Sequence, residues 1–132
     1  MCNITFNLKD DVLIVRIEGQ ISPAEIFDTV RKSIPISKPR EIWDMRKAEF
    51  TEMTAADVDR ITHIKKNLPY QRDQQVALVA ENDFEYGMCR MSSILFEVEN
   101  LPSKVQAFRS MEEAYRWLGL DPDLPVRNDS FL

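Results

Sequence analysis

The sequence Gln75–Glu99, QVALVAENDFEYGMCRMSSILFEVE, joins a short apolar run to a long helical pattern. The run Val76–Ala80 is too short for a helix and rich in valine, which is typical of a strand buried on both faces of a parallel sheet. After it, apolar residues recur every three or four positions, as on one face of a helix: Phe84, Met88, Met91, Leu95 and Val98. The stretch therefore predicts a buried strand followed directly by a long helix that shields it.

Helix-start signals recur along the chain, each a Ser, Thr or Asn followed three residues later by an acidic residue. They begin at Ser22, Thr54, Asn82 and Ser110. Their spacing of about 30 residues is the length of one strand–helix unit. At the third signal we expect the Asn82 side chain to accept a backbone N–H and Glu85 to reach back to it.

Four further segments have strand patterns. Asn3–Leu8 alternates polar and apolar residues, and Val12–Glu18 follows after a turn so short that only an antiparallel hairpin fits. Glu41–Arg46 and Lys104–Phe108 are the remaining strands, and Lys47–Met53 is interpreted as a polar connection. The expected order is β-β-α-β-α-β-α-β-α. This order predicts an α/β fold with a mixed, mostly parallel five-stranded sheet, one antiparallel hairpin strand and four helices.

The helices are expected to differ in which faces they bury. The helix Thr54–Leu68 should bury Val58, Ile61 and Leu68 and place Lys65 among its solvated residues. The last helix should turn four residues inward and stop at Gly119: Met111, Ala114, Tyr115 and Leu118. We expect residues 1–120 to form one domain. The segment 121–132 has no periodicity and is expected to pack on its own domain or on another chain.

Composition excludes several classes of function. The net charge is -5 and the pI about 4.9, whereas nucleic acids and anionic membranes need a basic surface. No apolar run approaches the roughly 20 residues of a membrane span. The N-terminal residues lack a secretory pattern, so we expect a cytoplasmic protein.

The residues that usually carry catalysis or bind metals are few. Cys2 and Cys89 are expected to be free thiols, and His63 a solvated surface residue. No CxxC or HxxxH spacing, glycine-rich phosphate loop or GxSxG motif occurs. We therefore predict no catalytic set, no metal site and no cofactor.

The central helix is apolar on more than one stripe, since Cys89, Ile94 and Phe96 project away from the first face. A neighbouring helix, a subunit interface or an apolar ligand groove could cover the additional stripe. Gly87 lowers helix stability, and its lack of a side chain suggests the close approach of a neighbouring element or a ligand.

Several short motifs in this order and spacing resemble the STAS-like group, named after the sporulation anti-sigma-factor antagonist. They extend from about Val12 to Leu120 and comprise Trp43-Asp44-Met45-Arg46, VALVA, Tyr86-Gly87 with Arg90-Met91, Val105–Phe108 and Glu113–Leu118. The resemblance implies the STAS fold, which is related in architecture to the CRAL-TRIO lipid-transfer domains. Ligands of open α/β sheets bind where strands end and helices begin. The predicted ligand-binding residues are Trp43, Asp44, Arg46, Tyr86, Gly87 and Arg90.

The antagonists of this group carry a phosphorylatable Ser or Thr at the start of the helix after the third strand. The Asp-Ser-Ser-Gly-like turn of the antagonists is missing here, and only Thr54 lies at a comparable helix start. Thr54 is therefore the candidate phosphate acceptor, opposed by the negative charge of Glu52 and Asp57.

Two functions of different classes follow. The first is a non-enzymatic cytoplasmic binding or regulatory module that interacts with other proteins and forms a homodimer. The second is a carrier or sensor of a small apolar or amphipathic, lipid-like ligand held between the central helix and the helix Thr54–Leu68. An enzyme acting through Asp44, Arg46 and Tyr86 is the least favoured alternative.

Overall fold

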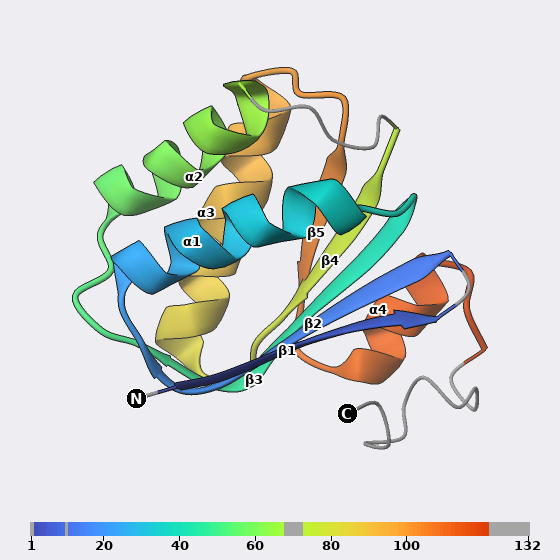
Figure 1. The fold of residues 1–132 in the computed structure, drawn as a ribbon, viewed down its shortest axis with the longest axis horizontal. Coiled ribbons are helices and arrows are strands. Elements are labelled where there is room, and N and C mark those ends of the chain that lie inside the picture. The colour runs from blue at the N-terminus through green and yellow to red at the C-terminus, as the bar shows by residue number, and fades with distance from the viewer. Residues whose placement is uncertain (1, 10, 68–72, 122–132) are drawn as a thin grey trace.

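A five-stranded sheet with helices on both faces makes up the fold (Figure 1). The computed structural model describes residues 2–9, 11–67 and 73–121. The strands are β1 (Cys2–Lys9), β2 (Val12–Ile21), β3 (Arg40–Phe50), β4 (Gln75–Val79) and β5 (Lys104–Phe108). The helices are α1 (Pro23–Ser33), α2 (Ala55–Asn67), α3 (Asp83–Val98) and α4 (Met111–Trp117), with a short 3-10 helix, η1 (Ile34–Ile36), after α1. The predicted element order and fold class are confirmed.

The strand order along the sheet is the order along the chain, β1-β2-β3-β4-β5. Only β1 and β2 are antiparallel, and the other three pairs are parallel. Because parallel connections are right-handed, three crossovers that advance in the same direction place α1, α2 and α3 on the same face. The helix α4 follows the last strand and packs on the opposite face (Figure 1).

The core consists of two apolar layers on either side of the sheet. The layer beneath α1, α2 and α3 contains alternate residues of β2 and β3 such as Leu13, Val15, Trp43 and Met45. The layer beneath α4 contains Val12, Ile14, Ile42, Ala77 and Val79 with Met111, Ala114, Tyr115 and Leu118. The predicted inward face of α4 is confirmed, and Gly119 ends this helix with a φ of 74°. The predicted burial of Val76–Ala80 inside the sheet is also confirmed.

The third strand is longer than the sequence pattern predicts. β3 continues through Lys47 to Phe50, and β2 continues beyond Glu18 to pair with it. Between Arg16 and Glu18 the register shifts, so that over this interval β3 contains one residue more than β2. A bulge of this kind reverses the alternation of side chains, and the inward residues change from Trp43 and Met45 to Ala48. The interpretation of Lys47–Met53 as a connection was wrong for Lys47–Phe50, because the bulge interrupts the period of two, and right for the last three residues.

Three of the four predicted helix caps are confirmed. The Oγ atoms of Ser22 and Ser110 accept the backbone N–H groups of Glu25 and Glu113, and Thr54 exchanges hydrogen bonds with Asp57. The cap at Asn82 differs. Asn82 occupies the N-cap position of α3, but its side chain makes no capping hydrogen bond.

Glu85 has a different role from the predicted cap. Its Oε2 accepts the backbone N–H of Phe50 at 2.9 Å, and the residue is only 5% exposed. Phe50 lies at the end of β3, beyond the last residue that β4 pairs. The carboxylate therefore supplies the acceptor that a neighbouring strand would otherwise provide, and it fixes the N-terminus of α3 to β3.

The buried face of α3 is displaced from the predicted one. Glu85, Cys89 and Phe96 are buried, whereas Phe84 and Val98, two members of the predicted stripe, are 49% and 69% exposed. The Glu85 side chain that bonds β3 lies on the same side of the helix as the buried Cys89 and Phe96, so this side is turned toward the core. The neighbouring helix α2 covers part of the remaining apolar surface of α3.

Two smaller predictions also fail, and one lies outside the described residues. Lys65, expected on the solvated side of α2, is buried. Within the described ranges, a methyl group added at Gly87 would meet no atom within 4 Å, so the expected approach of a neighbouring element is wrong, whereas the approach of a ligand stays a prediction. The predicted packing of 121–132 falls beyond the described residues except for Asp121. Among the described residues, no helix is long and apolar enough to cross a membrane.

Replacing Glu85 with alanine should lower the free energy of unfolding by about 2 kcal/mol, because the half-buried N–H of Phe50 loses its carboxylate acceptor. Urea unfolding followed by circular dichroism measures the change. Glu81→Ala, at an exposed position of the same segment, serves as the control and should stay within about 0.5 kcal/mol of the parent. Equal effects of the two substitutions would show that the Glu85 contact contributes nothing to stability.

Candidate functional site

The six predicted ligand-binding residues lie at three separate places. Trp43 faces the layer beneath α1, α2 and α3, and its Nε1–H donates to Glu41. Asp44 and Arg46 are bonded to each other at a different place in the sheet. Tyr86 contacts Arg109, whereas Gly87 and Arg90 are exposed on α3. The structure therefore pairs Asp44 with Arg46 and does not bring the six residues together.

Asp44 is held by two arginines. Its carboxylate accepts from Arg46 Nε at 2.8 Å and Nη2 at 2.9 Å, and from Arg16 Nε at 3.2 Å. Arg16 lies opposite Asp44 in the β2–β3 pairing, and Arg46 lies at the bulge. A hollow of about 40 Å³ adjoins this cluster, lined by Arg16, Ile17, Glu18, Asp44, Arg46 and Lys47. Burial alone would raise the pKa of Asp44, but the hydrogen bonds and charge of Arg46, with the charge of Arg16, hold that pKa below its ordinary value.

The carboxyl ends of β4 and β5 are the place where the chain turns to opposite faces, to α3 and to α4 respectively. Such a division forms the crevice in which open α/β sheets bind ligands. In this structure Arg109 occupies the crevice between the ends of β4 and β5. Its guanidinium donates to the Glu81 carbonyl at 2.6 Å and to Asp83 at 2.7 Å, and it stacks over the Tyr86 ring at 4.3 Å. Sequence reasoning missed Arg109 because a single arginine after a strand carries no recognisable signal.

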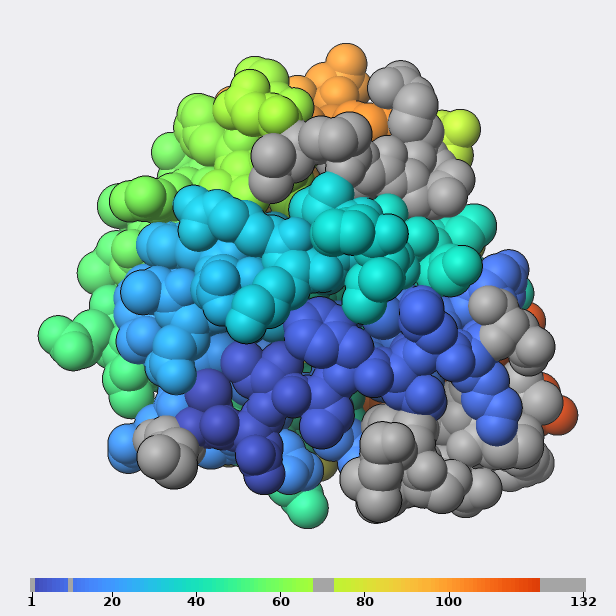
Figure 2. Space-filling view, in the orientation of Figure 1, coloured from blue at the N-terminus to red at the C-terminus, as the bar shows by residue number. Residues whose placement is uncertain are grey.

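A cavity of about 90 Å³ lies between the sheet and the three helices α1, α2 and α3. Its walls are mostly apolar and come from distant parts of the chain, including Val30, Trp43, Val58, Met88 and Phe96. The space-filling view shows the side chains of α1 as a continuous band between those of α2 and of the β1–β2 hairpin (Figure 2). Drug-sized ligands occupy about 300–1,000 Å³, so the cavity as it stands admits only a very small molecule.

A buried acid and a buried amine lie at this cavity. Glu41 on β3 is fully buried, and Lys65 on α2 is 6% exposed. The Glu41 carboxylate accepts from Trp43 Nε1 at 2.9 Å and from Gln74 Nε2 at 2.6 Å. Gln74 in turn donates to the Lys38 carbonyl at 2.8 Å. Sequence reasoning missed this network because Glu41 begins a predicted strand and Lys65 is adjacent to a second lysine, which suggested a solvated helix face.

Burial controls the ionisation of both groups. It raises the pKa of Glu41 above 4.5, and the charge of Lys65 with the hydrogen bonds from Trp43 and Gln74 opposes part of that increase. Burial likewise lowers the pKa of Lys65, opposed by the charge of Glu41. Each charge therefore stabilises the other inside an apolar layer.

The free thiols provide no reactive group in the cavity. Cys89 lines it, but burial, followed by the charge of Glu85, raises the pKa of its thiol to about 12. A neutral thiol is a poor nucleophile and a poor metal ligand. Within the described part of the chain, no group of three or more His, Cys, Asp and Glu side chains could hold a metal ion.

Thr54 presents its hydroxyl at the start of α2. The residue is exposed, and its Oγ1 lies 2.9 Å from Asp57 Oδ2 and accepts from the Asp57 backbone N–H at 3.4 Å. The hydroxyl is accessible, but a phosphate on it would face the Asp57 carboxylate.

Two solved structures resemble this fold over almost the whole chain. An anti-sigma factor antagonist from Mycobacterium paratuberculosis matches with a TM-score of 0.56 and 14% identity, covering 90% of this chain and 95% of the other. An uncharacterised protein from Shewanella loihica with a SpoIIAA-like fold matches with a TM-score of 0.51 and 15% identity, covering 89% and 93%. No protein-family model and no curated protein sequence matches the chain. At these identities the likeness establishes the fold alone.

The chain therefore has the STAS-like, or SpoIIAA-like, fold that the resemblance implied. The relation to CRAL-TRIO domains, the site residues and the phosphate acceptor stay predictions.

Lys65→Met should lower the free energy of unfolding by about 3 kcal/mol at pH 7, because it leaves Glu41 buried without an opposite charge. The folded-state pKa of Glu41 is raised, so the folded state binds the proton first and gains stability as the pH falls. The deficit of the variant should therefore shrink between pH 7 and pH 5, as measured by urea unfolding at each pH.

Two variants control this prediction. Lys66→Met removes an exposed pair with Glu99 and should cost at most about 1 kcal/mol. The double variant Glu41→Gln with Lys65→Met should recover most of the loss, since no charge stays buried. A deficit that grows as the pH falls would contradict a buried, charged Glu41.

Proposed function

We propose that the chain is a non-enzymatic regulatory module that acts in the cytoplasm by binding other proteins and by self-association. The proposal is supported by the fold, which the chain shares with an anti-sigma factor antagonist over 90% of its length. In proteins with shared folds the function lies in the surface and its sites. A property of this chain's own surface is therefore needed to support a binding role.

The exposed apolar face of α3 supplies that property. Phe84, Ile94 and Val98 are 49%, 53% and 69% exposed, and all three belong to one helix. An isolated exposed leucine or valine is ordinary, but several large apolar side chains on one element are typical of a contact surface for another protein. This observation carries the proposal.

Thr54 is the proposed site of control. Its hydroxyl is accessible at the start of α2, where backbone N–H groups and the helix dipole favour a phosphate. The contact with Asp57 opposes this, because the phosphate would displace the carboxylate that now bonds the Thr54 backbone N–H at 2.9 Å. Phosphorylation at Thr54 would thus rearrange the first turn of α2. This structural change is how phosphorylation would act as a switch.

The tagged chain, captured from its native host, should bring down one protein in near-stoichiometric amount, and part of the chain should carry a single phosphate on Thr54. Quantitative mass spectrometry of the captured complex and intact-mass analysis of the chain measure the two quantities. Thr54→Asn should abolish the phosphorylated form and keep a residue that caps helices well.

Thr51→Ala is the matched control, since the Thr51 hydroxyl is used internally, donating to the Ile21 carbonyl at 3.2 Å. It should leave both the phosphate and the partner unchanged. A chain that recovers no partner at comparable amount would overturn the proposed function. A partner without any phosphorylated chain would remove only the role of Thr54.

A carrier or sensor of a very small apolar ligand is the second candidate function. The cavity beneath α1, α2 and α3 favours it, since its apolar walls could hold an apolar body, and the Glu41 carboxyl and the Lys65 amine could hold a polar end. A volume of about 90 Å³ is smaller than the roughly 150 Å³ of a cavity known to take benzene. A lipid chain would therefore require α1, α2 and α3 to separate from the sheet.

If this second function is correct, native mass spectrometry of the chain purified from its host should detect one small molecule per chain. Ser92→Leu, which adds volume inside the cavity, should release that molecule, whereas Ser93→Leu on the neighbouring position should retain it. Protein that is free of any bound molecule in both spectra and solvent extracts would eliminate the candidate.

A further inference from the structure

The exposed apolar residues of α3 follow a seven-residue repeat. Phe84, Gly87, Met91, Ile94 and Val98 are separated by three, four, three and four positions, the spacing of the contact seam between two packed helices. We call these five residues the outer seam. Phe84, Gly87, Ile94 and Val98 are exposed, and Met91 is half-buried.

The outer seam lies on the opposite side of α3 from its core face. The buried residues Glu85, Cys89 and Phe96 are about half a turn away around the helix. Among the described residues the seam stays largely exposed, so it is open to contact by another chain.

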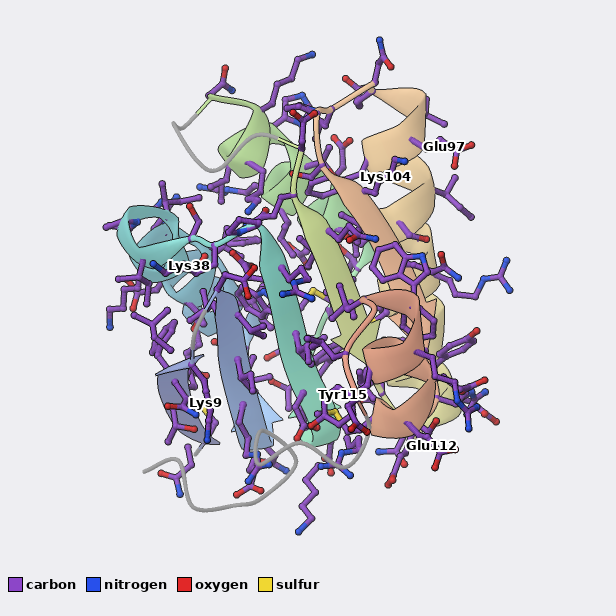
Figure 3. All side chains as sticks on the ribbon, turned by 90° about the vertical axis from the view of Figure 1, so that its right-hand side faces the viewer. Lys9, Lys38, Glu97, Lys104, Glu112 and Tyr115 are labelled. Atoms are coloured by element: carbon purple, nitrogen blue, oxygen red, sulfur yellow. The ribbon has the colours of Figure 1, made fainter. Side chains whose placement is uncertain are left out.

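The flank of the outer seam carries two opposite charges. Arg90 and Glu97 are seven residues apart, so both lie on one side of the seam, two turns and about 10 Å apart along the helix axis. Both side chains are exposed, and neither has an ion-pair partner among the described residues. Figure 3 shows the Glu97 side chain pointing away from the body of the molecule.

This charge arrangement is self-complementary in one orientation only. If two copies of α3 pack antiparallel, the same flanks meet, and Arg90 of each copy comes opposite Glu97 of the other. In a parallel pair, no opposite charge would stand across the seam from either residue. The residue Gly87 would then come opposite Val98 of the second copy, where the open space around this glycine can receive a side chain.

We propose that the outer seam binds a second copy of this chain, with the two α3 helices antiparallel and two symmetric Arg90–Glu97 pairs across the twofold axis. The proposal deepens the self-association in the proposed function, and it rests on that function only for its biological role. Closed twofold symmetry explains why one patch suffices, since each copy presents the same surface to the other.

Charge variants test the orientation as well as the contact. Arg90→Glu and Glu97→Arg each turn two attractive pairs into two repulsive ones, so each should raise the dissociation constant of the dimer at least about tenfold. An equimolar mixture of these two variants should restore association, because every pair across the seam is then attractive. The double variant Arg90→Glu with Glu97→Arg should also dimerise. Analytical ultracentrifugation over a concentration series measures all four.

Two further variants separate the seam from general charge effects. Ile94→Asp places a charge at the centre of the seam and should give a folded monomer, as circular dichroism can verify. Lys32→Glu changes an exposed residue on α1, away from the seam, and should leave the dissociation constant unchanged.

A chain that stays monomeric at the highest soluble concentration would overturn the proposal, as would a dimer insensitive to Ile94→Asp or not restored by the mixture. If the wild-type chain is monomeric and Ile94→Asp abolishes capture of the host partner, the seam binds a different protein. In that case this inference and the proposed self-association fail, and the proposed binding of other proteins stands. A chain that dimerises through the seam but captures no host partner would support this inference and overturn the proposed binding of other proteins.

Discussion

Burial of the central strands on both faces is the constraint on which the structure depends. β3 and β4 lie in the middle of the sheet, and Ile42, Ala77 and Val79 are completely enclosed. Strands of this kind need an apolar layer above and below them. Three right-handed crossovers can supply only one of these layers, because all three advance in the same direction along the sheet. The second layer requires α4, which is why the chain continues with a helix after its last strand.

The same burial determines how the polar side chains of β3 ionise. Glu41 and Asp44 are both nearly inaccessible and lie on opposite faces of one strand. At Glu41 burial outweighs the charge of Lys65 and the neutral hydrogen-bond donors, and its pKa rises. Asp44 meets two guanidinium groups, and its pKa falls. Two carboxylates three residues apart thus behave oppositely, because the number and kind of cations around each differ.

The third helix illustrates how an element can be apolar on both its buried and its exposed side. α3 is apolar around much of its circumference, so composition alone does not select an inward face. The hydrogen bond from Phe50 N–H to Glu85 lies on the side of α3 that also buries Cys89 and Phe96. Phe84, Ile94 and Val98 are then left on the surface. The side of α3 that completes β3 is thus opposite the exposed face on which the proposed interactions depend.

The sequence by itself determined the element order, the parallel sheet, three of the four caps and the inward face of α4. These features depend on residues close in the chain, through the periods of strands and helices and through hydrogen bonds over three positions. Tertiary structure alone decided the bulge that extends β3, the rotation of α3 and the burial of Glu41 and Lys65 at one cavity. It also decided that Trp43, Asp44 and Tyr86 lie at three separate places and that Arg109 fills the crevice. Each of these depends on which distant groups meet across the sheet, and one-dimensional patterns contain no information about such contacts.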